Sequence, residues 1–355
     1  MDILKRITSE FNLKEDHAKN VVALLDEGNT IPFIARYRKE MTGHIDDQVL
    51  RELAERLNYL RNVEKRKSEV SSLITEQGKM TGEIASAIAT AETLTEVEDI
   101  YRPYKQKRKT RATVAVAKGL EPLADILLAQ NITSGTSEDL AIPFVDAEKG
   151  VESVKDAIAG AEDIIAERVS DDAELRKKLR RIYLKNGEIV TKLTKTEDDA
   201  AKTYEMYADY SENVAEIKPH RILAINRGES EGYLKVKVLI DDAFAVRVCE
   251  AFFVKNESVT TSNVKNAVAD AYKRLIQPSI EREVRGLLTE NAQEQAIKMF
   301  DVNLRPLLMQ PPVKDKITMG FDPAYRTGCK IAVYPGENEL EALVTNALVV
   351  LRGVI

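Results

Sequence analysis

The chain has 355 residues, 31% of them charged, and a formal net charge of -6 at pH 7. This length allows two or three domains with a sizeable core. The overall acidity excludes a protein that adheres to nucleic acid over its whole surface, so any such contact must be local. Because tryptophan is absent and aromatic residues make up only 6%, helical layers are favoured over an aromatic β-sandwich.

The sequence offers few residues for a metal site or a disulfide and no apolar run for a membrane span. Cys249 and Cys329 lie far apart without a CxxC partner, and the three histidines are widely separated, so we expect reduced cysteines, no metal site and no cofactor. The N-terminus lacks the apolar core of a signal peptide, and no run approaches about 18 apolar residues. The sequence therefore predicts a cytoplasmic protein without membrane contact.

Short helices are predicted at the N-terminus, over residues 3–11 and 16–25. In the second, Ala18, Val21, Val22 and Leu25 are expected to line one face, and Gly28 to end the helix.

A first basic group follows in the segment TIPFIARYRKEMTGHIDD, residues 30–47. Pro32 favours a short helix and Gly43 a turn. The basic residues are Arg36, Arg38 and Lys39. They are either solvated cations on the outer side of this helix or contacts to nucleic acid, and the sequence leaves both open.

A long amphipathic helix is predicted from Asp46 onward. Its apolar positions recur at three- and four-residue steps: Leu50, Leu53, Leu57 and Leu60. Asp47 and Arg51 are spaced to form an i,i+4 ion pair, as are Glu52 and Arg56. Further helices are predicted over residues 83–91 and 122–129.

The densest cluster of charge is the basic segment, Tyr101–Arg111, which holds six basic residues and no acidic one. The basic residues are Arg102, Lys105, Lys107, Arg108, Lys109 and Arg111. Cations interleaved with aromatic rings, here Tyr101 and Tyr104, suit a phosphate backbone whose bases stack. Pro103 disfavours a regular helix and predicts a loop between helices. The alternative is that these cations pair with carboxylates of neighbouring helices.

A second apolar seam predicts another long helix near residues 151–169, followed by one over 173–184. The apolar positions of this seam are Val151, Val154, Ile158, Ala161 and Ile165. We expect this seam and the one at Leu50–Leu60 to share one helical core.

The pattern changes after Asn186, where the first strands are predicted. Residues 233–240 alternate in the way of a half-buried strand, and residues 189–193 show a weaker strand pattern. Between them, a helix with Arg221 and Arg227 as surface or interface cations is expected to end at Gly228. Helices are predicted again over 263–276 and 279–309, with Pro306 shortening the last turn.

The segment ITMGFDPAYRTGCKIAV, residues 317–333, predicts strand, turn and strand. Asp322 stands where RNase H-like folds place their first metal-binding acid, but a two-metal site needs several converging carboxylates. An Asp that caps a turn before Pro323 is the alternative.

Four segments together resemble the Tex family of bacterial transcription-accessory proteins. They are the residues 30–47 quoted above, VEDIYRPYKQKRKTRATVAVAKGLEPLAD at 97–125, PHRILAINRGE at 219–229 and MGFDPAYRTGCKIAV at 319–333. The resemblance implies a helical N-terminal region with a helix-turn-helix-like part, a YqgF-type RNase H-like domain, helix-hairpin-helix motifs and an S1 domain. It also implies DNA or RNA binding, attributed largely to the S1 domain, and makes nuclease activity unexpected.

The expected fold is mainly α, with a small mixed α/β part and the start of an RNase H-like domain. The expected domains are a helical region at 1–185, a mixed region with a long strut helix at 186–316, and the beginning of the RNase H-like domain at 317–355. After Val333 the sequence departs from the family pattern, which suggests a fragment or a rearranged chain. Its apolar residues from Leu340 to Ile355 predict self-association or aggregation.

The leading functional hypothesis is a non-catalytic nucleic-acid-binding scaffold of transcription. RNA is the preferred partner, with weak affinity, and the transcription machinery is a further partner. The alternatives are a metal-dependent RNase H-like nuclease that uses Asp322, and a protein-interaction scaffold whose basic segment faces an acidic partner.

Overall fold

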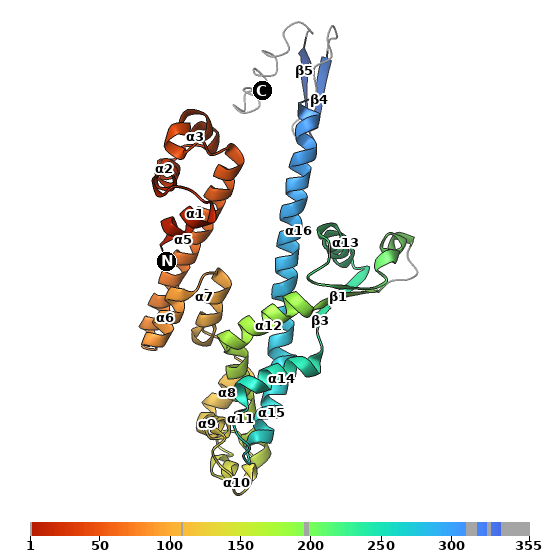
Figure 1. Ribbon diagram of the computed structural model, residues 1–355. Helices are drawn as coiled ribbons and strands as arrows, with labels where there is room; N and C mark the ends of the chain where they lie inside the picture. Colours follow the sequence, from red (N-terminus) through yellow and green to blue (C-terminus); the bar gives the residue numbers. More distant parts are fainter. Residues whose placement is uncertain (1, 108, 195–198, 310–317, 325–327, 335–355) are drawn as a thin grey trace. The chain divides into compact units, whose positions relative to one another are not determined.

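The computed structural model describes residues 2–107, 109–194, 199–309, 318–324 and 328–334 (Figure 1). The chain divides into two compact units, Met1–Thr289 and Glu290–Ile355. Helices dominate these residues, with a three-stranded antiparallel sheet before the last long helix and a two-stranded hairpin after it. This architecture confirms the predicted mainly α fold with a small mixed part. None of the described helices has the length and apolar composition that a membrane span requires.

The N-terminal part of the first unit is a series of seven helices. They are α1 (Ile3–Glu10), α2 (Glu15–Asp26), α3 (Ile31–Tyr37), α4 (Lys39–Thr42), α5 (Asp47–Glu76), α6 (Gly82–Thr90) and α7 (Leu94–Tyr101). The long α5 begins where Asp46 caps it, because the Asp46 carboxylate accepts a hydrogen bond of 2.9 Å from the Val49 N–H. The four predicted leucines of α5 are at most 2% exposed. They pack against Ile7, Val21 and Ile34 from α1, α2 and α3.

Two details of this region differ from the sequence predictions. In α2 the buried residues are Ala18, Val21 and Leu24, whereas Val22 and Leu25 are only partly buried, because α1 and α5 approach from a direction that the sequence does not reveal. Arg56 does not pair with Glu52. It forms a bidentate pair of 2.7 Å with Glu10 of α1, and a carboxylate from another helix thus replaces the local i,i+4 partner.

The middle of the first unit contains α8 (Arg111–Ala117), α9 (Glu121–Ala129), α10 (Ser137–Ala141), α11 (Val154–Asp171) and α12 (Ala173–Asn186). Ser153 begins α11 with a capping box, in which its hydroxyl and the Asp156 carboxylate each bond the other's backbone N–H. Helix α11 packs mainly on α8, α9 and α15 (Thr261–Asp270). The expectation that the α5 and α11 seams share one core is therefore wrong. The α11 seam packs on α8, α9 and α15, and the apolar cluster around Leu50–Leu60 contains no residue of α11.

The strands before the last long helix all lie after Asn186, as predicted. The strands β1 (Glu188–Leu193), β2 (Asp209–Asn213) and β3 (Leu234–Leu239) form an antiparallel sheet in the order β2-β1-β3. In β3, Leu234, Val236 and Val238 are buried and the intervening lysines are exposed. The sequence analysis missed β2, whose residues DYSEN lack the apolar alternation of a strand and pair only because β1 offers a free edge.

Gly228 does not end its helix, contrary to the prediction. Helix α13 (Pro219–Ser230) continues through it, and the left-handed residue that follows the helix is Gly232, with φ +78°. A Cβ at Gly228 would lie 2.6 Å from Leu234 Cδ1 and 2.8 Å from Tyr204 Cδ1. Glycine is needed here because helix, strand and tyrosine approach one another closely, and this requirement arises only in the tertiary structure.

After α14 (Asp242–Phe253), one nearly continuous helical stretch is formed by α15, a π-helical segment at Ala271–Ile276 and α16 (Gln277–Leu308). The π-helical segment precedes Pro278, which has no N–H to donate to an α-helical carbonyl. Pro306 lies inside α16, which continues two residues beyond it to Leu308. The strands β4 (Thr318–Ala324) and β5 (Gly328–Tyr334) pair antiparallel as the predicted hairpin. The segment from Leu340 to Ile355 lies outside the described residues.

The α5 seam provides a test of this packing. The change Leu57→Asp places a carboxylate at a position only 2% exposed, where no local partner can compensate its burial. We expect a loss of several kcal/mol in the free energy of unfolding, measured by urea denaturation. The change Leu57→Met, which nearly conserves volume, should cost less than about 1.5 kcal/mol. An unchanged melting temperature in Leu57→Asp would show that this seam is exposed.

Candidate nucleic-acid interface

The basic segment joins α7 to α8. A single 3-10 turn, Arg102–Tyr104, follows α7 and contains Pro103. Helix α8 starts at Arg111. Thr110 caps α8 with its hydroxyl and completes a capping box with Thr113. The prediction of an irregular connection between helices is confirmed, with the addition of the 3-10 turn.

Two of the six cations are held by carboxylates of α11. Arg102 Nε lies 3.3 Å from Asp171 Oδ1. The Lys107 ammonium contacts Asp171 Oδ2 and lies 3.5 Å from Glu167 Oε1. Because Asp171 is only 7% exposed, these contacts hold the basic segment against α11 at two points, Arg102 and Lys107. Arg102 and Lys107 therefore have a structural role.

Lys105, Lys109 and Arg111 are exposed. Within the described residues, none of the three has a carboxylate oxygen within 4.0 Å. The sixth cation, Arg108, lies outside those residues. The basic segment thus has a paired set that faces α11 and an unpaired set that faces solvent.

Lys109 and Arg111 line an open cleft of about 670 Å³ between α8 and α11. Lys118 is on the same wall, and its ammonium donates to the Gly150 carbonyl at 2.6 Å. The cleft also includes Asp163, whose pKa is raised by burial, although the positive charges of Arg274 and Arg111 oppose that shift. Asp163 also forms an ion pair of 2.9 Å with Arg274.

The two tyrosines of the basic segment do not present the free ring faces that base stacking requires. Tyr101 is 9% exposed and belongs to the apolar cluster around Val97 and Ile88. The Arg66 guanidinium lies 5.6 Å from its ring centroid. Tyr104 is half-buried against the same cluster, and its carbonyl accepts a hydrogen bond from Gln77 at 2.9 Å. Both rings contribute mainly to packing.

The first basic group lies on α3 and α4. Arg36, Arg38 and Lys39 are all exposed, and within the part of the chain that the structure describes no carboxylate lies within ion-pair distance of them. Arg38 Nη1 donates to the Tyr37 carbonyl at 3.2 Å, at the end of α3. This group therefore resembles the unpaired set of the basic segment.

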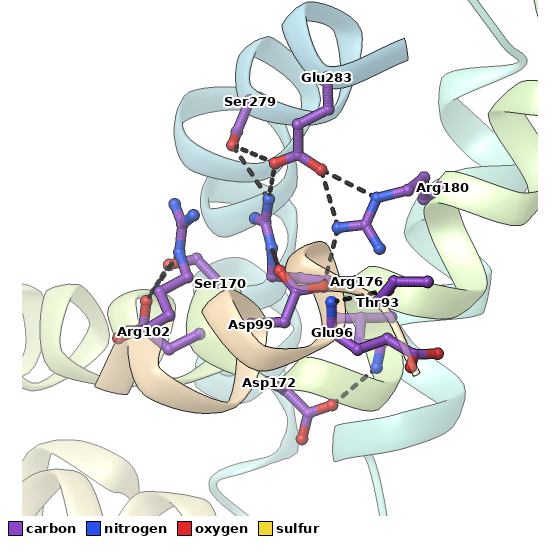
Figure 2. A network of polar contacts seen from close by, with 12 residues as sticks. Thr93, Glu96, Asp99, Arg102, Ser170, Asp172, Arg176, Arg180, Ser279 and Glu283 are labelled. Carbon is purple, nitrogen blue, oxygen red and sulfur yellow. Dashed lines mark hydrogen bonds and ion pairs between the residues drawn. The ribbon is translucent and has the colours of Figure 1, made fainter. Parts of the chain in front are cut away.

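A buried ion network joins α7, α12 and α16 and fixes the helix from which the basic segment begins (Figure 2). Arg176 of α12 is fully buried. Its Nε donates to Asp99 at 3.0 Å, and its Nη2 donates to Ser279 at 3.0 Å and also contacts Glu283. Arg180 Nη2 lies 2.8 Å from both carboxylates. Each carboxylate therefore receives hydrogen bonds from both guanidinium groups.

The network shifts the protonation equilibria of its members. Burial disfavours the ionised Glu283, but the charges of Arg176 and Arg180 outweigh this effect and lower its pKa below the usual 4.5. Burial likewise opposes the charge of Arg180, whose pKa is nevertheless raised by Asp99 and Glu283. Sequence reasoning missed this network. Its one local signal was the i,i+4 spacing of two arginines on α12, which by itself indicates an exposed face.

Asp322 belongs to β4 and faces Lys330 in the register of the hairpin. Within the described residues there is no group of three or more His, Cys, Asp or Glu side chains that could hold a metal ion. The buried Cys249 is a free thiol, and burial raises its pKa to about 12, so it is inert near neutral pH.

These features define a multi-helical chain with a small antiparallel sheet and locally basic surfaces on an acidic background. Residues 1–75 match the Tex-like protein N-terminal domain, and residues 133–300 match the Tex central region. The chain belongs to the Tex family. The α3–α4 basic group lies inside the first match, and the basic segment lies between the two.

Curated relatives agree with this assignment. The protein YdcI of Bacillus subtilis (strain 168) is 47% identical over 334 residues, 93% of this chain and 46% of that protein. Transcriptional accessory protein Tex of Neisseria gonorrhoeae is 36% identical over 346 residues, 96% of this chain and 45% of that protein. S1 RNA-binding domain-containing protein 1 of Homo sapiens is 32% identical over 349 residues, 94% and 34% of the two chains. The chain thus spans less than half the length of these relatives.

The buried network predicts different results for two neighbouring residues of α12. Arg176→Ala leaves the buried Asp99 and the partly buried Glu283 with one cation fewer, and should lower the free energy of unfolding by about 3–5 kcal/mol. The matched control is Lys177→Ala, which removes an ion pair of 2.8 Å with Glu96 whose lysine is 58% exposed, and should cost at most about 1 kcal/mol. Equal losses in urea denaturation would contradict a special role for the network.

The lowered pKa of Glu283 predicts a pH dependence. A carboxylate with a depressed pKa in the folded state stabilises fully above its unfolded value, here 4.5, and loses that contribution as the pH falls through the folded value. The stability difference between wild type and Glu283→Gln should be largest at neutral pH and shrink below pH 4.5. Glu55→Gln, at an exposed position of α5, serves as control. A difference that stays constant down to pH 3 (roughly one unit or more below the unfolded value) would refute this linkage.

Proposed function

We propose that this chain is a nucleic-acid-binding part of a transcription-accessory protein, that it acts without catalysis, and that it contacts the phosphate backbone, with RNA preferred. The observation that carries the proposal is the exposed, unpaired state of Lys105, Lys109 and Arg111 beside Arg102 and Lys107, which are paired. Cations without a carboxylate partner are available to replace the counterions of a polyanion.

The relatives support the proposal by their names, which refer to a transcriptional accessory protein and to an S1 RNA-binding domain. The chain's net charge of -6 disfavours attachment over the whole surface. Binding is therefore local and weak, in the non-specific range of about 10⁻⁴–10⁻⁶ M at physiological salt. Cytoplasmic localisation and contact with the transcription machinery belong to the same proposal.

The α3–α4 group provides a second set of phosphate contacts in this proposal. Arg36, Arg38 and Lys39 share exposure and the lack of a carboxylate partner within the described ranges with the unpaired set of the basic segment. Tyr101 and Tyr104 are given no stacking role, because their rings pack in the cluster around Val97.

The test is the salt dependence of binding to a fluorescent single-stranded RNA. Each neutralised phosphate of a single strand contributes about 0.7 to the slope of log K against log salt, and of a duplex about 0.9. Replacing Lys105, Lys109 and Arg111 with Gln should therefore reduce the slope by about two to three units and weaken all sequences alike.

Two controls separate phosphate contact from other effects. Replacing the scattered, exposed Lys65, Lys185 and Lys255 with Gln removes the same total charge and should change the slope by less than about one unit. Replacing Arg102 and Lys107 should lower thermal stability instead, because both hold the turn to α11. A slope that the first triple variant leaves unchanged would exclude the basic segment as a nucleic-acid site.

A protein-interaction scaffold is a second candidate, favoured by one observation. In the described part of the second unit, α16 exposes Ile297, Met299, Phe300 and Val302, each 61–70% exposed. Apolar side chains gathered on one helix are typical of a docking surface. RNA binding that is absent or insensitive to salt would favour this candidate. The nuclease alternative predicts magnesium-dependent cleavage of duplex or branched nucleic acid that Asp322→Asn abolishes.

A further inference from the structure

The surface of α3 and α4 combines an exposed aromatic ring with unpaired cations. This aromatic-basic patch consists of Phe33, Arg36, Tyr37, Arg38 and Lys39. Tyr37 is 66% exposed. The centroid of its ring lies 5.3 Å from that of Phe33, one helical turn earlier, with an interplanar angle of 44°. The Tyr37 ring does not contribute to the hydrophobic core, because most of its apolar area is exposed to water.

The local sequence explains why Tyr37 faces outward. Helix α3 has two turns, and its buried side chain is Ile34, which is 0% exposed and packs against α5 together with the partly buried Ile31. Phe33 and Tyr37 are separated by four positions and therefore share another face of the helix. The pair is thus presented by the same periodicity that buries Ile34.

The backbone under the patch is tightly fixed. Thr42 of α4 is 0% exposed, and its hydroxyl donates to the Arg38 carbonyl at 3.2 Å. Asn20 of α2 donates to the Met41 carbonyl at 2.9 Å. Gly43, at φ +73°, lies so close to His17 that a Cβ would be 2.2 Å from the imidazole Nδ1. These contacts hold α4 against α2, and a flat ligand would meet a surface that needs little ordering on binding.

The charges around the rings are arranged for a polyanion. The Arg38 guanidinium carbon lies 5.1 Å from the Phe33 ring centroid. In the described part of the chain, Arg36, Arg38 and Lys39 have no carboxylate within 4.0 Å, although Glu40 follows directly in sequence. Three exposed cations thus lie within two positions of the exposed Tyr37 in the sequence, and one of them, Arg38, lies over the neighbouring Phe33 ring.

We propose that the aromatic-basic patch is a stacking platform for an unpaired base of single-stranded nucleic acid. The Tyr37 ring stacks on one base, and Arg36 and Lys39 contact the phosphates on either side. This inference rests on the proposed function and adds the substrate class, a strand whose bases are free. A duplex hides the faces of its bases, whereas every single-stranded base offers one to an aromatic ring.

The chain contains no tryptophan, so Tyr37→Trp creates a single tryptophan reporter at the platform, which can be excited at wavelengths where tyrosine does not absorb. The ligand is an oligouridylate of about 12 nucleotides, a length within the range of known single-strand site sizes. Its effect on the tryptophan emission of the protein is compared with the effect of an abasic ribose-phosphate strand of equal length. We expect the oligouridylate to quench the emission of the Tyr37→Trp protein, and the abasic strand to leave it unchanged. The control Ile142→Trp, at a position 58% exposed with no charged residue in 140–144, should not respond to either strand.

Binding affinities complete the test. Tyr37→Ala should weaken oligouridylate binding by about 5- to 100-fold and leave the abasic strand and the melting temperature unaffected, whereas Tyr37→Phe should bind as wild type does. If wild type binds with the expected salt dependence but Tyr37→Ala binds equally well, the platform is refuted and the proposed function stands. Equal quenching by an RNA duplex would also refute it. If neither strand binds wild type, both proposals fail, and the patch is left to a protein partner.

Discussion

The structure depends on a fully buried arginine that two carboxylates neutralise. Arg176 has no exposed surface, and its desolvation is offset only because Asp99 of α7 and Glu283 of α16 meet it with Arg180 alongside. One nitrogen, Arg176 Nη1, has no hydrogen-bond partner within the described residues. A buried ion pair of this kind contributes geometric definition more than net stability. It fixes the mutual orientation of three helices, α7, α12 and α16, that lie far apart in the sequence.

The same physical rule divides the cations of the surface. Asp171 at the end of α11 is buried, so it holds Arg102 and Lys107 where they contact it. The cations that alternate with them, Lys105 and Lys109, are exposed and have no carboxylate within ion-pair distance among the described residues. A run of positive charge that looks uniform in the sequence therefore contains two functions: one set fastens a connection between helices, and the other is free to meet an external anion.

The two basic surfaces differ in their aromatic partners. In the basic segment the tyrosines pack inward, because α5 and α7 need apolar cover for Val63 and Val97. On α3 the core is already filled by Ile34, and Tyr37 remains outside. The chemistry available to each surface follows from this difference. The basic segment offers charge alone, whereas the α3–α4 patch offers charge together with a ring.

The sequence alone determined the long helices α5 and α11, because their apolar residues repeat with the helical period and Asp46 and Ser153 cap their first turns. It also determined the strands β1 and β3, the hairpin β4–β5, and the family, through segments long enough to be specific. Tertiary structure alone decided which cations of the basic segment are paired, since their carboxylates lie on α11, more than one helix away in sequence. It also decided the burial of Arg176 and the need for glycine at position 228. Each of these depends on which neighbour arrives from another part of the chain, and local periodicity carries no information about that neighbour.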